Sequence, residues 1–446
     1  MNTNCTTKEA LKAQVIAAID ANKERIIAIG EEIFAHPELG FKEERTAQLV
    51  KDVLNELQIP YEDHLAITGV KGNLKGRKSD IRVMVMGELD AVVCPLHPQA
   101  DLKTGAAHSC GHNSQIATML GAAFGLAPFA DQLDGDVAFV AVPAEEYVEL
   151  EYRQRLKEDG KLFFFGGKQE FIRLGVLDDI DMGMMIHSHA NQTDRRFLIG
   201  CDSSGFIGKL IRFTGKEAHA GARPFDGINA LNAAALSLLA INSQRETFRE
   251  KDRIRIHPII TKGGDLVNIV PADIRMETYV RGTNLAGILD ASGKVNRSLK
   301  GCAYAIGAEV EVDELPGYLP MIQNPHLSKL FADNGEQLLG EGTSIYGEEI
   351  MGATDAGDIS SVMPFIHMST GGYTGDAHSK DFAITDKEMA YVMPAKAMTM
   401  TVIDLLWDNA AEAKRIKADF TPKMTKESYM DFWNRFCEGS VDKNEF

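Results

Sequence analysis

The sequence predicts an α/β protein whose sheet domain is interrupted by a second, smaller domain. In the first part of the chain, short apolar runs typical of buried strands alternate with helical patterns. A β-α-β-β-α-β order follows, and α/β patterns resume behind a proline-bearing boundary at 316–320. The expected division is therefore 1–196 and 317–446 for the sheet domain, with 197–316 as the inserted domain.

Composition is that of a globular protein with sizeable cores. The 446 residues are 44% hydrophobic and 25% charged, which allows two or three domains. Neither a transmembrane run nor a secretory signal is expected, because no apolar run of eighteen residues and no basic-then-apolar start occurs. The formal net charge of −17 argues against nucleic acid and anionic membranes as partners. Six cysteines without disulfide-framework spacing favour reduced thiols and a cytoplasmic location: Cys5, Cys94, Cys110, Cys201, Cys302 and Cys437.

The chain is expected to open with two helical stretches. Thr6 and Glu9 have the spacing of a capping box ahead of an apolar helical pattern. A second helical pattern covers 44–57, and the turn-rich motif H-P-E-L-G-F at 36–41 lies between the two. These segments supply packing faces rather than chemistry.

Side chains suited to metal binding or catalysis follow three expected strands. The run from Ile81 ends in G-E-L-D and places Asp90 just past the strand, where open α/β sheets form ligand sites. The run D-V-A-F-V-A-V-P-A ends in Glu145 and Glu146, and M-G-M-M-I ends in His187. One acid of the pair can ligate a metal while its neighbour acts as a base, and the repetition predicts a metal site at this sheet edge. Capping of a turn is the ordinary alternative for Asp90.

The stretch Ala106–Gly121 carries His108, Cys110 and His112 within five residues. In an extended segment, residues two apart point to the same side, so Cys110 and His112 are expected to converge on one ion. Gly111 permits a tight turn. A thiolate beside an imidazole suits zinc and also accepts manganese, nickel or cobalt. The cluster alone leaves two alternatives open, a packed core loop and a Cys/His nucleophile pair.

The inserted domain is expected to contain two helices and four strands. In chain order they are a strand at 205–215, a helix at 227–243, strands at 254–261 and 273–281, a helix at 285–306 and a strand at 309–315. Behind it, a Gly/Asp-rich loop carries His378 ahead of a long helical pattern at 386–408.

Eight motifs occur in order over nearly the whole chain: H-P-E-L-G-F, G-E-L-D-A, H-S-C-G-H-N, V-P-A-E-E, M-I-H, K-E-A-H-A-G-A-R-P, N-I-V-P-A-D and A-H-S. This set resembles the metal-dependent amidohydrolase family of aminoacylases, carboxypeptidase G, auxin-conjugate hydrolases and aminobenzoyl-glutamate hydrolases. It is most similar to the bacterial aminobenzoyl-glutamate and N-acyl amino acid hydrolase branch. The resemblance implies a mixed-sheet metallopeptidase catalytic domain of the phosphorylase/hydrolase-like type, with an inserted ferredoxin-like domain for dimerisation or as a lid.

The resemblance also implies roles for particular residues. The set that matches the family's two-metal ligands is Cys110, His112, Glu146, His187 and His378. Glu145 matches the general base, Asp90 a supporting carboxylate, and His219 a residue that reaches the partner subunit's active site in a homodimer. Asn268 and Arg281 match positions that hold the substrate's carboxylate or carbonyl. A plain loop role for His219 and a structural role for Arg281 are the alternatives.

The expected reaction is hydrolysis of the amide bond of an N-acyl or N-aroyl amino acid, such as aminobenzoyl-glutamate or an indole-acetyl amino acid. Two divalent ions, manganese or zinc with nickel or cobalt also compatible, would share a water and lower its pKa. Glu145 would take its proton and pass it to the leaving amine, and His219 would help to stabilise the oxyanion. A dipeptidase with the same chemistry is the runner-up. From other classes, a hydrolase with Cys110 as nucleophile and a non-catalytic binder remain open.

Three departures from the family pattern concern the substrate more than the reaction. Asn113 stands where aspartate is usual and is expected to change hydrogen bonding to a ligand histidine. The polar stretch 147–170 is longer than the compact family pattern and is expected to form an inserted loop or helical hairpin beside the pocket. The loop G-A-T-D-A-G-D replaces the commoner Glu-Asp-Phe version.

Overall fold

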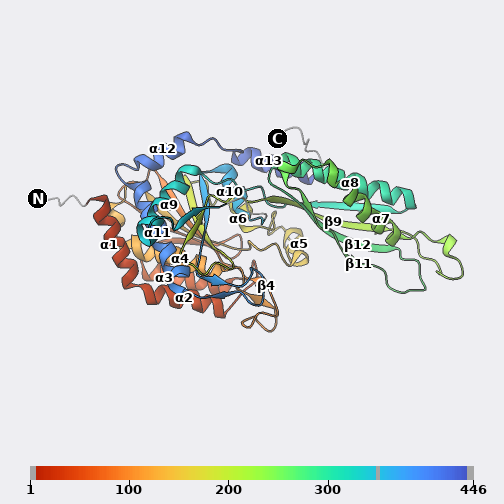
Figure 1. Ribbon diagram of the computed structural model, residues 1–446, viewed down its shortest axis with the longest axis horizontal. Coiled ribbons are helices and arrows are strands. Elements are labelled where there is room, and N and C mark those ends of the chain that lie inside the picture. The colour runs from red at the N-terminus through yellow and green to blue at the C-terminus, as the bar shows by residue number, and fades with distance from the viewer. Residues whose placement is uncertain (1–6, 348–351, 439–446) are drawn as a thin grey trace, which may run out of the picture. The chain divides into compact units, whose positions relative to one another are not determined.

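The computed structural model describes residues 7–347 and 352–438, and by internal contacts the chain forms two units. Unit 1 contains 7–202, 322–347 and 358–426; unit 2 contains 203–321, 352–357 and 427–438 (Figure 1). The short strand β8 (Phe197–Ile199), just inside the predicted insertion, pairs with the strands of unit 1. The three-segment division and the role of the insertion stay predictions.

Unit 1 is built on a mixed eight-stranded sheet in the order β1-β2-β6-β3-β7-β15-β8-β14. Its strands are β1 (Tyr61–Leu65), β2 (Gly69–Leu74), β3 (Arg82–Glu88), β6 (Asp136–Val142), β7 (Met182–Ser188), β8, β14 (Ser344–Tyr346) and β15 (Phe365–Thr370). The four central strands β6, β3, β7 and β15 are mutually parallel, so their carboxyl ends lie along one edge of the sheet. Two small two-stranded sheets, β4 with β5 and β16 with β17, stand in loops: Val92–Val93, Ala106–Ala107, Tyr373–Thr374 and Ala383–Ile384.

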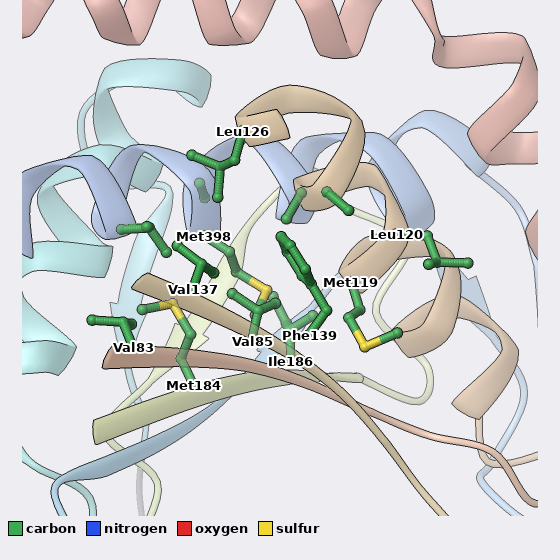
Figure 2. Packing of buried hydrophobic residues seen from close by; sticks show 14 of the residues in the cluster. Val83, Val85, Met119, Leu120, Leu126, Val137, Phe139, Met184, Ile186 and Met398 are labelled. Carbon is green, nitrogen blue, oxygen red and sulfur yellow. The ribbon is translucent and has the colours of Figure 1, made fainter. Parts of the chain in front are cut away.

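Helices cover this sheet because its central strands are apolar on both faces. They are α1 (Lys8–Ala21), α2 (Lys23–Ala35), α3 (Glu44–Glu56), α4 (His112–Leu126), α5 (Leu150–Glu158), α6 (Gly167–Leu174), α9 (Pro325–Leu339), α11 (Met393–Leu406) and α12 (Ala411–Asp419). Figure 2 shows strand side chains such as Val85, Phe139 and Ile186 pointing towards Met119 of α4 and Met398 of α11. This packing fixes α4, whose first turn carries His112, against the strand ends.

Two expectations for the chain ends and the apolar segments need adjustment. The predicted capping residue Thr6 lies outside the described residues, and Thr7 caps α1 by accepting a hydrogen bond from the Ala10 backbone N–H at 3.2 Å. The helical segment Glu388–Leu406 is long and apolar enough for a membrane span, with mean hydropathy 1.2. All of that window is buried within the protein, as in a core helix. The described cysteines are free thiols, and Cys5 lies outside the described residues.

Unit 2 has a five-stranded antiparallel sheet and two helices in the predicted chain order, and a third helix near the end of the chain. Its elements are β9 (Gly205–Thr214), α7 (Ala230–Ser243), β10 (Arg255–Ile256), β11 (Ile259–Lys262), β12 (Asp273–Gly282), α8 (Leu285–Ile306), β13 (Glu309–Leu315) and the C-terminal helix α13 (Lys426–Cys437). The strand expected at 254–261 is interrupted between Ile256 and Ile259, because Pro258 has no backbone N–H to continue the ladder with β12. The short helix α10 (Ala356–Val362) lies between β14 and β15 in the chain.

Candidate metal centre

Three neighbouring parallel strands bring the predicted acids and histidine together at one edge of the sheet. β3 lies between β6 and β7 and pairs in parallel with both. Asp90 follows β3, and Glu145 and Glu146 follow β6. His187 is the last residue but one of β7. The strand-end reasoning therefore places these side chains where the structure has them.

The Cys110–His112 segment is a tight turn rather than an extended strand. Gly111 has a φ of 91°, and His112 is already the first residue of α4. A Cβ at Gly111 would lie 2.6 Å from the Cβ of Ser188, so only glycine fits this left-handed position. The expectation that alternation along a strand aligns Cys110 with His112 is thus wrong in its mechanism, although the two side chains do converge.

Two groups of side chains that could each hold a cation share the sulfur of Cys110. In the first group, Cys110 Sγ lies 3.3 Å from Nε2 of His187, and Nε2 of His112 completes the set. In the second, Nε2 of His378 lies 3.3 Å from the same sulfur and 3.1 Å from Oε1 of Glu146. The ligand atoms within each group lie within 4.8 Å of one another. A thiolate in this position can bridge two ions.

Backbone contacts orient the histidines of both groups. Nδ1 of His112 lies 2.9 Å from the carbonyl oxygen of Asp90 and 3.2 Å from its Oδ1. This contact commits the Nδ1 proton to Asp90 and leaves the Nε2 lone pair for a ligand. The backbone N–H of His378 donates to the carbonyl of Ser109 at 2.8 Å, which ties the β16–β17 loop to the cysteine turn. Asp90 thus holds the position predicted for a supporting carboxylate.

The electrostatics of the cluster favour ionised ligands. Burial and the Glu146 carboxylate raise the pKa of the Cys110 thiol, but the imidazoles of His187 and His112 outweigh them and lower it to about 6. Contacts with Cys110 and Glu146 raise the pKa of His378 to about 11. Burial alone would raise the pKa of Glu146, yet His378 lowers it to about 2. The thiolate and the Glu146 carboxylate are therefore paired with protonated imidazoles, whose protons a divalent cation would displace.

The residues present fit a divalent cation by two tests. Nε2 of His112 and Oε1 of Glu146 are buried, and each lies within 3.1 Å of another possible ligand atom, Oε2 of Glu88 and Nε2 of His378 respectively, so several lone pairs converge in one buried cluster. Thiolate, imidazole and carboxylate together form a borderline-soft donor set that suits zinc or manganese. The donor set does not choose between them.

A third group, not predicted from the sequence, joins Glu88 to His112 and Glu145. Oε2 of Glu88 lies 3.0 Å from Nε2 of His112, and Oε1 lies 2.5 Å from the ammonium of Lys168. Both side chains of the Lys168–Glu88 ion pair are fully buried. Glu88 could have been found by the same strand-end reasoning, because it precedes Asp90 by two residues in G-E-L-D. Nothing in the sequence pattern singled out Lys168.

His367, which no sequence motif singles out, also borders the cluster. Its ring packs edge-on against His187 with centroids 5.5 Å apart, and burial lowers its pKa to about 3. A neutral ring behind His187 adds bulk without positive charge.

Among the described residues, Asn113 makes no hydrogen bond to a ligand histidine. Its side-chain amide donates to the carbonyl of Gly30 and to the hydroxyl of Tyr391, both at 3.1 Å. It therefore fastens the start of α4 to the helices beside it. The inserted stretch after Glu146 forms helix α5, and α6 follows where a separate helical pattern is found near 168–174.

The three remaining predicted residues lie in unit 2. His219 and Asn268 are neighbours: His219 forms an isolated bridge with Ile269, and Ala220 N–H donates to the Asn268 carbonyl at 2.9 Å. Arg281 lies near the other end of β12, with its guanidinium 5.2 Å and 5.3 Å from the ring centroids of Phe206 and Tyr279. Within unit 2, His219 and Asn268 therefore lie together, and Arg281 lies apart from them.

Comparison with known proteins assigns the chain to a family. Residues 84–399 match the model of peptidase family M20/M25/M40. The chain is 25% identical to the Xaa-Arg dipeptidase of Mus musculus over 450 residues, which cover 95% of each chain. It is 28% identical to the N-acyl-L-amino acid amidohydrolase of Geobacillus stearothermophilus over 335 residues, covering 71% of this chain and 81% of the relative.

Solved structures agree with this assignment at the level of the fold. A dinuclear metal binding peptidase of the M20 family from Bacillus subtilis superimposes with a TM-score of 0.66 at 21% identity, over 87% of this chain and 99% of the other. With the family match and the clustered ligand residues, these similarities show that the chain is a hydrolytic enzyme that belongs to peptidase family M20/M25/M40.

Proposed function

We propose that this enzyme is a two-metal amidohydrolase that cleaves the amide bond of an N-acyl or N-aroyl amino acid. The products would be a carboxylic acid and a free amino acid. The observation that carries the proposal is the sulfur of Cys110, which belongs to two separate ligand groups and can bridge two ions. The similarity to an N-acyl-L-amino acid amidohydrolase supports the substrate class.

The proposed chemistry divides between the ions and the protein. When bound, two divalent ions, manganese or zinc with nickel or cobalt also compatible, polarise the amide carbonyl and acidify a water. Glu145, whose Oε2 lies 3.9 Å from Nε2 of His112, takes a proton from this water and delivers it to the leaving amine. Cys110, His112, His187, Glu146 and His378 hold the ions in this proposal.

Arg281 has the surroundings of an anion-binding residue. Burial lowers its pKa, and its guanidinium lies beside the packed rings of Phe206 and Tyr279. Among the residues that the structure describes, no carboxylate pairs with it. A half-buried guanidinium without a partner carboxylate is suited to hold the free carboxylate of the amino acid product through a bidentate contact.

His219 is arranged as a hydrogen-bond donor. Its Nδ1 accepts the backbone N–H groups of Gly221 and Ala222 at 3.2 and 3.1 Å, so the neutral ring carries its proton on Nε2. The side chain is exposed and can present this proton to a developing oxyanion. Asn268 lies on the neighbouring segment and would assist it.

The separation inside unit 2 supports a homodimer. Asp273 and Arg281 are eight residues apart on β12, which corresponds to about 27 Å at about 3.4 Å per residue. His219 pairs with Ile269, which precedes Asp273 in the chain and so lies beyond the end of β12 that is far from Arg281. One copy of unit 2 therefore cannot bring His219 and Arg281 to the same substrate. We therefore propose that His219 and Asn268 act on the active site of a second copy. Exposed apolar side chains on α7 and on the edge strand β11, including Leu239 and Ile259, suit such an interface.

A dipeptidase is the second candidate function. The relative named Xaa-Arg dipeptidase matches this chain over 95% of its length, further than the N-acyl amino acid hydrolase does. The two candidates differ in whether the acyl side of the substrate must carry a free amine. For either we propose a cytoplasmic enzyme, because the described cysteines are free thiols.

The test is to measure the amino acid released from acetyl, aminobenzoyl, indole-acetyl and dipeptide substrates by liquid chromatography with mass detection. Each substrate is incubated with manganese, zinc or chelator, and Glu145→Gln is the control. Release that needs both metal and Glu145 supports the proposal and identifies the acyl preference. Chelator-resistant release that thiol alkylation abolishes would instead identify Cys110 as a nucleophile. If metal-loaded protein cleaves nothing in the panel, the substrate proposal fails.

A further inference from the structure

The turn that carries Glu145 and Glu146 is conformationally strained. We call residues 143–146 the acid turn. Ala144 has a φ of 54°, in the left-handed region that residues with a Cβ rarely adopt. A strained turn keeps one conformation only where its surroundings impose it. The contacts around the acid turn therefore decide where both carboxylates point.

Two buried carboxylates hold the backbone N–H groups of the acid turn. Oε1 of Glu43 accepts the N–H of Ala144 at 2.9 Å, and Oδ2 of Asp90 accepts the N–H of Glu146 at 2.9 Å. Glu43 is itself fixed by the hydroxyl of Thr68, which donates to its Oε2 at 2.6 Å. These contacts satisfy the donors of the turn but leave its carbonyl side to other groups.

On the carbonyl side, the backbone N–H of Val148 donates to the carbonyl of Glu146 at 2.9 Å and that of Gly167 to the carbonyl of Ala144 at 3.3 Å. Arg153, from helix α5 of the inserted stretch, adds a charged donor to the same side. Its Nη2 donates to the carbonyl of Glu146 at 2.5 Å, and its Nη1 donates to the carbonyl of Phe165 at 2.6 Å. The residue is 1% exposed, and among the described residues it forms no ion pair. Burial of an unpaired guanidinium is unfavourable, so the two carbonyls that accept its hydrogen bonds within the described part of the chain account for its position.

The motif H-P-E-L-G-F closes this arrangement from the opposite side. The ring of Phe41 faces the guanidinium, 5.3 Å from its central carbon. A Cβ on Gly40 would lie 2.6 Å from Nη2 of Arg153 and 2.9 Å from the Cα of Ala144. Glycine is therefore required at position 40 because the acid turn and Arg153 both approach its backbone closely.

We propose that Arg153 is a positioning residue that fixes the acid turn, and that this is a role of the inserted stretch. Arg153 touches neither substrate nor metal; it acts by holding the carbonyl of Glu146 while Glu43 and Asp90 hold the N–H groups. Loss of this contact releases the strain at Ala144 and moves Glu146 away from Cys110 and His378. The inference rests on the proposed function for its kinetic consequence, and on the ligand geometry alone for its effect on metal binding.

The test compares Arg153→Met and Arg153→Lys with a matched control, Lys12→Met. Lys12 is also a buried cation, but it bonds Asn334 and Asp404 between helices of unit 1 rather than the acid turn. Metal affinity is measured by chelator competition, and kcat and KM are measured on whichever substrate the wild-type enzyme cleaves. For Arg153→Met we expect metal affinity and kcat to fall about 10–100-fold, as for lost outer contacts of metal ligands, with KM within about 3-fold of wild type. Arg153→Lys keeps one donor and is expected to recover part of the loss.

The control and a second variant separate positioning from general stability. Lys12→Met is expected to lower thermal stability while metal affinity and kcat stay unchanged. If Arg153→Met does not fold, Gly40→Ala disturbs the same arrangement, because its Cβ would lie 2.6 Å from Nη2 of Arg153 and 2.9 Å from the Cα of Ala144. The same loss of metal affinity and kcat is expected, with KM little changed. Wild-type metal affinity and kcat in a folded Arg153→Met or Gly40→Ala variant would overturn the proposal. Wild-type protein that cleaves no substrate would refute the proposed function alone, because the metal-affinity comparison still tests the positioning role.

Discussion

Replacement of Lys168 by methionine is expected to destabilise the protein strongly. Nζ of Lys168 lies 2.5 Å from Oε1 of Glu88, and neither side chain is more than 1% exposed. Removing one partner of such a pair leaves a carboxylate buried next to His112 without its cation, which costs about 3–5 kcal/mol. The hydrogen bond that Gln115 donates to Glu88 at 2.6 Å remains and keeps the loss within this range.

The assay is urea denaturation of wild type, Lys168→Met, Glu88→Gln and the double variant, each with and without saturating metal. In the double variant the uncompensated charge is absent, so we expect at least half of the Lys168→Met loss to be recovered. A Lys168→Met loss below about 1 kcal/mol, the range of an exposed pair, would refute the reasoning. Strict additivity of the two single variants would refute it as well, because residues in direct contact should couple.

Three further predictions concern metal, pH and assembly. Both ligand groups share the sulfur of Cys110, so the Cys110→Ala variant should lose two ions per chain after dialysis and the His187→Asn variant only one. Elemental analysis measures the ions that remain, and equal losses in the two variants would contradict the bridging role. Burial raises the pKa of Asp404, but hydrogen bonds from lysines outweigh it and lower the pKa. The ionised Asp404 therefore stabilises the folded protein fully above its unfolded pKa of about 3.9, and this contribution is lost as the pH falls further. In urea titrations, Asp404→Asn should lower the free energy of unfolding by about 3 kcal/mol at pH 7 and by progressively less below about pH 4. Leu239→Glu places a charge on the exposed face of α7 and should convert a wild-type dimer to monomer in light scattering; a fully active wild-type monomer would contradict the dimer.

The strand-end residues could be predicted because their positions follow from local patterns. An apolar run sets the strand, and the residue after it reaches the sheet edge whatever the rest of the chain does. Asp90, Glu146 and His187 meet for this reason. The order of elements in unit 2 was predictable in the same way, except at Pro258, where the missing N–H interrupts a strand that hydrophobicity alone makes continuous.

Other parts of the site depend on contacts between distant segments. Lys168 is 80 residues from Glu88, and Arg153 reaches a carbonyl rather than a charged side chain, so neither leaves a signal in local spacing. The partners of Asn113, Gly30 and Tyr391, are 83 and 278 residues away in the chain, so local spacing does not identify them.

By itself, the sequence determined the strands, the helices and the ligand chemistry, because hydrophobic period and residue type act over a few residues. The tertiary structure alone decided how the ligands are shared and supported. Cys110 became common to two groups only when β7 and the His378 loop packed on either side of it. The buried cations Arg153 and Lys168 acquired partners by the same route, because a charge is retained in a core only where folding supplies groups to satisfy it.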